Sequence, residues 1–428
     1  MLSQETAIEL PYGDKTLSLR LPQENVSYFV AVGEASAAKD AFEEVRRALQ
    51  KPIGHPGIKK SVKKGDKVVI LGDDISRPTP CDKLIPPLLS ELNNAGIPDH
   101  DIKIIVSPGT HRPMTEKEFG IKFGDDAVKR VEIHNHDFKD KKKLVNMGVT
   151  RLGTPILVNK EFYDADFKIG LGGIIPHPFG WAGGGKIVEP GICGSETTYK
   201  VHRLGASYRI QDLIGDVGNP VRLEIEEVAK KAGLNMIVNT IINAKKELIS
   251  VVAGDIIEAH REGVRRAERL YRPKVPYRTD IAIVGSPGQG VNIDYWQAIK
   301  GVLAATCFVK EGGTIIAASP CYEGIPARDH PEILKLGALN YEEALRALDT
   351  GRYTDPSLPG FLAINAQTRA FANIILYSEG LTEEDCKILG LGKTPSLEEA
   401  TREALKKYGK KATVGISRHF EVFPQVVG

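Results

Sequence analysis

Short apolar runs alternate with amphipathic, helix-like segments along most of this chain. The apolar runs lie at 67–71, 102–107, 131–134, 167–175, 280–288, 312–320 and 412–417. Near-continuous apolar runs are typical of strands buried on both faces, and helical segments between them supply the crossovers of parallel sheets. The pattern therefore predicts an α/β fold with mainly parallel sheets flanked by helices.

The length of 428 residues exceeds what one ordinary hydrophobic core holds, so two domains are expected. A strongly helical segment at 254–270 is followed by YRPKVPYR at 271–278, whose prolines end the helix. We therefore predict an N-terminal α/β domain at 1–272 and a C-terminal α/β domain at 273–428. The active site is expected in the cleft between them.

The composition excludes several classes of protein. The formal net charge is only +2, and the densest basic cluster, KDKKK at 139–143, is interpreted as a solvated turn, so no nucleic-acid partner is expected. No apolar stretch approaches the ~20 residues that span a bilayer, so no membrane partner is expected either. Five scattered cysteines without a CxxC pair fit a reducing cytoplasm, which is the predicted location.

Polar and charged side chains follow several of the apolar runs. Asp74 and Arg77 follow the first run, His111 the second, His177 a later one, and Gln297 and Lys300 come after 280–288. Because ligands bind outside the carboxyl ends of strands in open α/β sheets, these loops predict one site. Arginine binds a carboxylate bidentately and histidine transfers protons near neutral pH, which indicates chemistry on a small hydroxy acid.

Each of these residues also has a structural explanation. Arg77 precedes a proline and fits a surface turn, and His111 lies in a Pro-Gly turn where a lone histidine is more often structural. His134 and His136 resemble a metal pair, but their spacing on an extended segment places them on opposite faces. We interpret those two as solvated or structural.

The stretch PHPFGWAGGGK, residues 176–186, brings three glycines next to a lysine. It lacks the Ser or Thr that follows the lysine in a phosphate-binding loop, and no glycine motif of the chain has the dinucleotide-binding order. Lys186 among glycines and apolar residues suits covalent chemistry, since desolvation lowers the pKa of an amine, but a phosphate-pairing or structural role is equally open.

Five motifs in their order along the chain resemble the nickel-dependent lactate racemase family of 2-hydroxyacid racemases and epimerases. They are DxxRPxP (74–80), GTHRPMT (109–115), PHPFGWAGGGK (176–186), SETTYKVH (195–202) and WQAIKG (296–301). Because the similarity runs across nearly the whole chain in matching order, it is far more specific than any single motif.

The resemblance implies a cofactor and its ligands. Lys186 would be joined through a thioamide to a nickel-pincer nucleotide, a pyridinium-3-thioamide-5-thiocarboxylic acid mononucleotide that carries Ni. His202 would be the protein ligand of the nickel, which accepts sulfur and imidazole donors. Backbone donors for this cofactor would come from Gly183, Gly184 and Gly185, with Asp74 beside it. Separate biosynthetic enzymes would supply the cofactor and are expected partners.

The resemblance also implies a reaction. His111 and His177 would be the acid/base pair, one on each side of the substrate. Arg77 and Lys300 would bind the carboxylate, with Gln297 and Trp296 also in the substrate site. The expected activity is inversion of C2 of lactate or a larger 2-hydroxy acid by a hydride relay through the cofactor. A homodimer is one of the assembly states left open.

Two other functions are kept as alternatives. An NAD-dependent 2-hydroxyacid dehydrogenase would use the same arginine and histidine chemistry, and a non-catalytic protein that binds a small acid or a nucleotide would keep the fold.

The segment AINAQ at 363–367 lacks a tryptophan that lactate-specific family members have there, which predicts a substrate larger than lactate.

Overall fold

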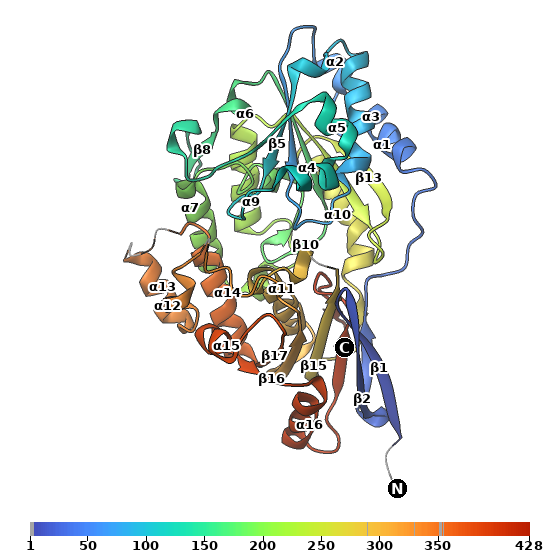
Figure 1. Ribbon diagram of the computed structural model, residues 1–428, viewed down its shortest axis with the longest axis vertical. Helices are drawn as coiled ribbons and strands as arrows, with labels where there is room; N and C mark the ends of the chain where they lie inside the picture. Colours follow the sequence, from blue (N-terminus) through green and yellow to red (C-terminus); the bar gives the residue numbers. More distant parts are fainter. Residues whose placement is uncertain (1–3, 289, 329, 351–352, 354) are drawn as a thin grey trace.

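The computed structural model describes residues 4–428 apart from 289, 329, 351–352 and 354. It contains two large sheets, each covered by helices on both faces, with the functional loops between them (Figure 1). This confirms the predicted α/β fold with mainly parallel sheets.

The first sheet has six strands in the order β13-β12-β9-β4-β5-β6, and every neighbouring pair is parallel except β12 with β13. The strands are β4 (Val68–Asp73), β5 (Ile102–Ser107), β6 (Glu132–Asn135), β9 (Phe167–Gly173), β12 (Met236–Ile242) and β13 (Leu248–Gly254). The associated helices are α1 (Ala41–Gln50), α2 (Ile58–Ser61), α3 (Cys81–Asn94), α4 (Glu116–Phe123), α5 (Asp125–Arg130), α6 (Lys160–Asp164), α9 (Pro220–Lys231) and α10 (Glu258–Tyr271).

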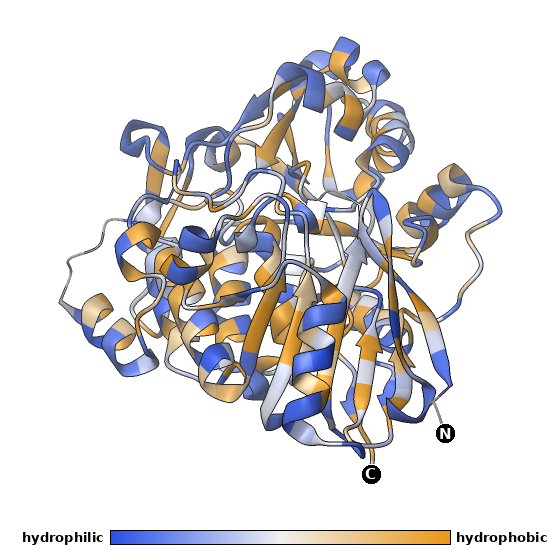
Figure 2. Cartoon of the chain, turned by 60° about the horizontal axis from the view of Figure 1, so that its bottom comes forward, coloured by the Kyte–Doolittle hydropathy of each residue, from blue (hydrophilic) through white to orange (hydrophobic). Residues whose placement is uncertain are grey.

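Alternate residues of β4 pack into different cores because successive side chains of a strand point to opposite faces. Val68 and Ile70 join the cluster formed with α1 and α3, whereas Val69 and Leu71 join the cluster formed with α6 and α9. Figure 2 shows the apolar strands enclosed by helices whose outer faces are hydrophilic. Burial on both faces explains why this strand reads as an unbroken apolar run in the sequence.

The second sheet has eight strands. The order is β18-β17-β16-β15, after which β15 pairs with both β1 and β19, β1 with β2, and β19 with β3. The strands are β1 (Glu5–Gly13), β2 (Lys15–Pro22), β3 (Val26–Val30), β15 (Thr279–Pro287), β16 (Val309–Ala318), β17 (Asn373–Tyr377), β18 (Gly392–Lys393) and β19 (Val414–Ser417). The associated helices are α11 (Tyr295–Thr306), α12 (Ile333–Leu336), α13 (Tyr341–Asp349), α14 (Leu358–Phe371), α15 (Glu383–Leu389) and α16 (Leu397–Tyr408).

The N-terminal strands differ from the predicted division of the chain. The prediction assigned residues 1–272 to one domain, but β1, β2 and β3 hydrogen-bond within the second sheet, with Tyr12 opposite Ser286 and Val30 opposite Ser417. The start of the chain therefore packs with the C-terminal segment. The boundary at 272 stays a prediction.

Smaller elements lie outside the two large sheets. The hairpins are β7 (Leu144–Val149) with β8 (Pro155–Asn159) and β10 (Pro176–His177) with β11 (Gly180–Trp181), and β14 (Lys274–Val275) pairs with β20 (Gln425–Val426). The helices α7 (Ser195–Ala206) and α8 (Ile210–Leu213) follow a short 3-10 turn, η4 (Gly184–Ile187). One buried cluster contains Trp181 and Val201 together with Val302 and Phe361, so the core is continuous between the two halves.

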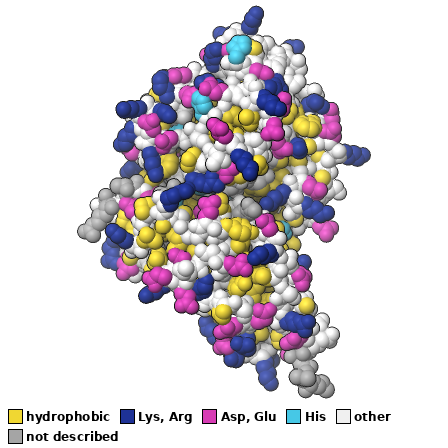
Figure 3. All heavy atoms as spheres, viewed as in Figure 1, with side chains coloured by type: hydrophobic (Ala, Val, Ile, Leu, Met, Phe, Trp, Pro, Cys, Tyr) yellow, Lys and Arg dark blue, Asp and Glu magenta, His cyan; other side chains and the backbone are white. Residues whose placement is uncertain are grey.

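Charged side chains of both signs are intermingled on the face seen in Figure 3, in line with the small net charge. The predicted solvated turn at 139–143 includes a 3-10 turn (Lys141–Lys143) that has no buried residue. No helix within the described residues is long and apolar enough to cross a membrane.

Candidate active site between the two sheets

A cavity lies between loops from the first sheet and the helices α11 and α14 of the second. The predicted site residues that line it are Asp74, Arg77, His111, His177, Gly183, Lys186, His202, Trp296, Gln297 and Lys300. Of the predicted set, only Gly184 and Gly185 do not line the cavity. Residues as distant in the sequence as Asp73 and Ile364 meet here because strand-end loops of one sheet face helices of the other.

Two cationic side chains converge on one amide oxygen. Nη1 of Arg77 donates to Oε1 of Gln297 at 3.1 Å, and Nζ of Lys300 donates to the same oxygen at 2.5 Å. Gln297 and Lys300 lie three residues apart in α11, and this spacing places them on one helical face. Burial, reinforced by the charge of Arg77, lowers the pKa of Lys300 to about 7. Such a cluster suits an anion.

The loop that carries Arg77 is held by Lys122, a residue that the sequence did not single out. Nζ of Lys122 donates to the carbonyl oxygens of Arg77 and Thr79 at 2.9 and 3.0 Å, and it pairs with Asp73 at 2.6 Å. Lys122 is 5% exposed, so this ion pair fixes the loop from inside the protein. Nothing in its sequence context marks it, because its role depends on contacts over more than forty residues.

His111 is oriented as a base. Its Nδ1 lies 2.9 Å from Oδ2 of Asp74, and since a carboxylate only accepts, Nδ1 carries the proton. Burial raises the pKa of Asp74, but the interaction with His111 and the charge of Arg77 outweigh burial and hold this pKa far below its usual range. Nε2 of His111 faces two donors, Arg77 at 3.4 Å and Gln297 at 3.2 Å, and therefore holds a lone pair.

His177 has the opposite tautomer. The backbone N–H of Phe179 donates to Nδ1 of His177 at 3.0 Å, so in the neutral ring the proton is on Nε2. Burial, aided by the nearby charge of Lys186, holds the pKa of His177 well below its usual range. The two histidines thus offer one lone pair and one N–H at their Nε2 atoms.

His202 presents a free nitrogen. Its Nδ1 lies 2.9 Å from the carbonyl oxygen of Thr198, one turn earlier in α7, so Nδ1 carries the proton and Nε2 a lone pair. The ring is confined between Phe179, with centroids 5.5 Å apart, and Gly360, where an added Cβ would come within 2.7 Å of Cδ2. Burial lowers the pKa of His202 to about 4, which keeps the ring neutral.

Lys186 faces the same aromatic ring. Its Nζ lies 5.8 Å from the centroid of Phe179, whose ring also contacts that of His177 at 5.5 Å. Burial lowers the pKa of Lys186 to about 8, with the carboxyl group of Glu189 acting in the opposite direction. Phe179 is therefore the common neighbour of His177, His202 and Lys186, although no sequence pattern singled it out.

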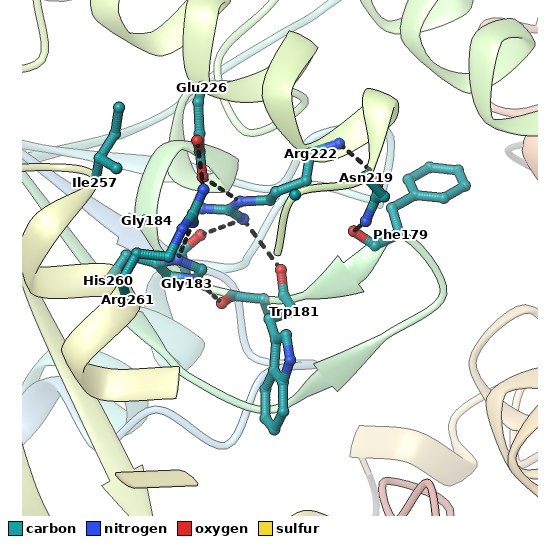
Figure 4. Close-up of polar contacts among 12 residues, drawn as sticks. Phe179, Trp181, Gly183, Gly184, Asn219, Arg222, Glu226, Ile257, His260 and Arg261 are labelled. Carbon is teal, nitrogen blue, oxygen red and sulfur yellow. Dashed lines mark hydrogen bonds and ion pairs between the residues drawn. The ribbon is translucent and has the colours of Figure 1, made fainter. Parts of the chain in front are cut away.

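Buried charges beneath the glycine stretch hold its backbone (Figure 4). Nη1 of the fully buried Arg222 donates to the carbonyl oxygens of Trp181 and Gly183, both at 3.0 Å, and its Nε donates to Glu226 at 2.8 Å. Nε2 of His260 lies 2.9 Å from the intervening carbonyl oxygen of Ala182. Three consecutive carbonyl groups are thus bound from the side of α9 and α10.

The same packing gives two of the three glycines a structural role, while their assignment to the cofactor stays a prediction. Gly184 has a φ of +58°, and a Cβ there would clash with Arg222 and His260, whereas a Cβ at Gly185 would meet Ala229 of α9 at 2.9 Å. Both glycines allow close packing of the loop onto the helices behind it. Only Gly183 of the three faces the cavity.

Trp296 forms a flat wall of the cavity. Its indole stacks on Phe361 with centroids 4.4 Å apart and on His330 at 4.2 Å, and the interplanar angles are 9° and 11°. Nδ1 of His330 lies 2.5 Å from Oδ2 of Asp355, so the stack is fixed at its outer end. His330 and Phe361 are site-supporting residues that the sequence did not reveal.

The other histidines have structural surroundings. His136 is buried, with Nε2 at 3.0 Å from the carbonyl oxygen of Cys193, and His134 forms ion pairs with Glu132 and Glu161 near the surface. These contacts fit the interpretation of the pair as structural or solvated, which stays a prediction. Within the described residues, no three His, Cys, Asp or Glu side chains form a group that could hold a metal ion.

Comparisons with known proteins agree with this geometry. Residues 12–211 match the lactate racemase N-terminal domain, and residues 275–419 match the lactate racemase C-terminal domain. The chain is 32% identical to the lactate racemase of Lactiplantibacillus plantarum over 324 residues, which are 74% of this chain and 76% of that protein. It is 30% identical to the lactate racemase of Thermoanaerobacterium thermosaccharolyticum over 324 residues, 74% of this chain and 75% of that protein.

Solved structures share the fold. The lactate racemase apoprotein of T. thermosaccharolyticum superposes with a TM-score of 0.85 and 24% identity, covering 98% of this chain and all of that one. A protein from Thermotoga maritima superposes with a TM-score of 0.73 and 20% identity, covering 92% of this chain and all of that one. With both domain models and both relatives in agreement, the chain belongs to the lactate racemase family and is an isomerase.

Proposed function

We propose that this protein inverts the configuration at C2 of a 2-hydroxy acid. The observation that carries the proposal is the meeting of two buried histidines from separate loops with the Arg77–Lys300 pair in one cavity. A reaction that interconverts enantiomers needs an acid/base group on each side of the reacting carbon.

Arg77 and Lys300 bind the substrate carboxylate in this proposal. Both already direct a donor at the side-chain oxygen of Gln297, which occupies the place of an anionic acceptor. Arginine adds a planar pair of donors that fixes the plane of the carboxylate, whereas lysine adds a point charge. The substrate is thereby oriented with its C2 hydroxyl group toward the histidines.

The histidines move the hydroxyl proton. The lone pair on Nε2 of His111 accepts it, and Asp74 stabilises the resulting imidazolium through the Nδ1–H that it already binds. His177 performs the complementary transfer from its own loop. Nε2 of His177 already carries the proton in this tautomer, so His177 can accept a proton there only after its own proton has moved to Nδ1, which requires the hydrogen bond from the Phe179 N–H to open.

The residues fit the nickel-pincer nucleotide that the family resemblance implies. His202 offers a neutral nitrogen donor and Lys186 an amine whose pKa is lowered to about 8, and the backbone of Gly183 lines the same cavity. When bound, this group accepts and returns a hydride. Since no group of three protein ligands exists among the described residues, His202 would provide a single donor and the cofactor the others.

The two alternatives are weaker. A nicotinamide-dependent dehydrogenase is not favoured, because the relatives are racemases and the glycine loop is packed against Arg222 rather than arranged as a dinucleotide fingerprint. A non-catalytic binding protein would need neither an amine of lowered pKa nor a nitrogen ligand in the same cavity. Cofactor-biosynthesis enzymes as partners, a cytoplasmic location and the oligomeric state stay predictions.

The experiment is an inversion assay on protein co-expressed with the cofactor-biosynthesis enzymes. Single enantiomers of several 2-hydroxy acids are incubated with the protein, and both enantiomers are quantified by chiral chromatography. We expect at least one acid to be converted to a mixture without net accumulation of keto acid. Protein expressed without the biosynthetic enzymes is the control. Net oxidation that requires added NAD, or no inversion of any acid by nickel-loaded protein, would overturn the proposal.

A further inference from the structure

Glu189 is a buried acid that no step of the proposed reaction uses. It lies three residues after Lys186 and is 1% exposed. Neither of its carboxyl oxygens has a hydrogen-bond partner within the part of the chain that the structure describes. Burial of a polar group without a hydrogen bond is unfavourable, and burial of an unpaired charge is more so, which points to a specific role for Glu189.

The backbone places Glu189 beside Lys186. The N–H of Glu189 donates to the carbonyl oxygen of Gly185 at 3.1 Å, and this bond to the fourth preceding residue closes one helical turn. Residues three apart in such a turn are neighbours, with roughly 5–6 Å between their Cβ atoms. Lys186 lines the active-site cavity and Glu189 does not, so the acid reaches the lysine from within the protein rather than from the cavity.

The surroundings of this acid are apolar. Val188, Ile192 and Cys193 flank it in the chain, and all three are 0% exposed members of one core cluster. The same cluster includes Ala229 of α9, the helix against which the glycine stretch packs. Solvent is therefore kept away from the carboxyl group, whose charge depends on the ionisable groups nearby.

Burial brings the proton affinities of Glu189 and Lys186 close together. It raises the pKa of Glu189 to about 8, where the charge of Lys186 opposes burial and that of Glu224 adds to it. It lowers the pKa of Lys186 to about 8, where Glu189 opposes burial and the cations Arg222 and Arg77 add to it. An ordinary lysine and glutamate titrate near 10.4 and 4.3, so a proton normally stays on the lysine. Here it can pass between the two side chains in either direction.

We propose that Glu189 is the proton acceptor of Lys186, and that this pair makes Lys186 a nucleophile toward a thiocarboxyl group. The carboxylate removes one proton from the ammonium group, which frees the lone pair of Nζ for attack. The pair itself is independent of the proposed function, whereas its use in attaching the cofactor rests on that function.

The attachment is a condensation without a redox change. A bond forms between Nζ of Lys186 and the thiocarboxylate carbon, and the bond from that carbon to its oxygen breaks. Of the three ammonium protons, one passes to Glu189, one leaves with the oxygen, and one remains on the thioamide nitrogen. A proton from solvent completes the departing water molecule. Because a carboxylate beside a neutral thioamide would be an unpaired buried charge, the first proton stays on Glu189.

The first test measures the pair in protein expressed without the biosynthetic enzymes. Modification of the Lys186 peptide by acetic anhydride is followed by mass spectrometry between about pH 6 and pH 10. The midpoint should lie at about 8 in the parent protein. In Glu189→Gln it should move to lower pH by about one unit or more, because the opposing charge is gone. His177 and His202 also face Lys186, but burial lowers the pKa of both, so neither ring becomes charged in this range.

The second test measures attachment. Cofactor-free protein is incubated with free cofactor made by the biosynthetic enzymes, and the mass adduct at Lys186 is followed over time. Although its lysine is less protonated, Glu189→Gln should form the adduct at least about tenfold more slowly, because general acid/base assistance is lost. Glu189→Asp keeps a carboxylate, so it should return the midpoint toward that of the parent and recover part of the rate.

Glu224→Gln is the matched control. Glu224 is 2% exposed and lies in the same region, but it accepts a hydrogen bond from Thr150 at 2.5 Å. This variant should keep the midpoint and the rate of attachment of the parent, and the melting temperature of every variant verifies that it is folded. Equal effects of Glu224→Gln and Glu189→Gln would overturn the specific role of Glu189.

The remaining outcomes separate this inference from the proposed function. An unchanged midpoint in Glu189→Gln would show that Glu189 does not act on Lys186. A lower midpoint with equal or faster attachment would reduce Glu189 to a charge that tunes the lysine and overturn its role as proton acceptor. Absence of an adduct in the parent protein would overturn the attachment step. Loaded protein that inverts no acid would overturn the proposed function alone, because neither test depends on turnover.

Discussion

The carbonyl oxygen of Thr198 accepts the Nδ1–H of His202 at 2.9 Å, which leaves Nε2 of the ring as the only nitrogen that can bind a metal. This relationship is built into α7, because residues four apart lie on the same helical face. A neutral imidazole whose other nitrogen donates to a carbonyl group is the usual state of a histidine ligand.

We therefore predict that His202→Ala loses nickel. The His202→Ala protein, co-expressed with the biosynthetic enzymes, should contain far less nickel by elemental analysis than the parent protein while remaining folded. His100→Ala, which changes a histidine with an 80% exposed side chain, is the control. Stoichiometric nickel in the His202 variant would show that another residue is the ligand.

Lys186 of the cofactor-free protein should react with acylating reagents more readily than an exposed lysine. With a pKa of about 8, roughly half of it is free amine at pH 8, compared with well under one per cent of an ordinary lysine. A small acylating reagent at limiting concentration should modify the peptide that contains Lys186 before that of Lys141, an 80% exposed lysine. After co-expression, the Lys186 peptide should instead carry an adduct of mononucleotide mass. An unmodified peptide from active enzyme would contradict covalent attachment.

Arg77 should bind the substrate through its planar pair of donors. Loss of a charge-assisted hydrogen bond costs roughly 1.5–3 kcal/mol, so Arg77→Ala should lower kcat/KM about tenfold to over a hundredfold. Arg77→Lys should also impair the enzyme, since an ammonium cannot reproduce the fork. Arg151→Ala, at a surface pair with Glu227, should have no effect. Unchanged kinetics of Arg77→Ala would remove this residue from the site.

The two histidines should separate the half-reactions. Each full inversion uses both, so His111→Gln and His177→Gln should each abolish it. In single-turnover experiments with pure enantiomers, each variant should retain the step that begins at the other histidine, with opposite preferences. General acid/base assistance contributes about 10²–10⁴-fold to a rate, so the two enantiomers should react at very different rates in each variant. The same preference in both variants would show that one histidine is structural.

Stability should fall in mild acid. Burial lowers the pKa of His136 and of His419 to about 4, whereas an unfolded histidine titrates near 6.5. Between these values the unfolded chain binds more protons than the folded one, so the free energy of unfolding decreases as the pH falls from 6.5 to 4. Urea denaturation at several pH values between 6.5 and 4 measures this decrease in the free energy of unfolding. The glutamine in His136→Gln cannot be protonated, so this variant should show a weaker dependence of the free energy of unfolding on pH. An unchanged slope would contradict the prediction.

The parts of the site that could be predicted follow the carboxyl ends of buried strands. Apolar runs located β4, β5, β9 and β15, and the loops after them supplied Arg77, His111 and His177. These positions are predictable because a strand buried on both faces leaves a continuous apolar run in the sequence, and a parallel sheet brings the carboxyl ends of its strands together. The nickel and the role of His202 came only from the family resemblance, which also favoured the covalent role over the structural one that the sequence left equally open for Lys186.

Other features depend on contacts that leave no local signal. Lys122 and Arg222 read as ordinary helical residues, yet each is buried and binds carbonyl groups of a functional loop. Gly184 and Gly185 looked like ligand-binding glycines, and only the position of α9 shows that they permit packing. A sequence pattern cannot distinguish a glycine that faces a ligand from one that faces a helix.

The pairing of Tyr12 with Ser286 and of Val30 with Ser417 has a consequence for biosynthesis. A ribosome produces the first thirty residues long before their partner strands exist, so these segments must wait while the intervening sheet forms. Contacts over such sequence separations are slow to close. Expression of 273–428 by itself would yield a polypeptide without strands β1, β2 and β3, and its unpaired strand edges would favour self-association. Adding a synthetic peptide of residues 4–30 would be the direct way to restore its solubility.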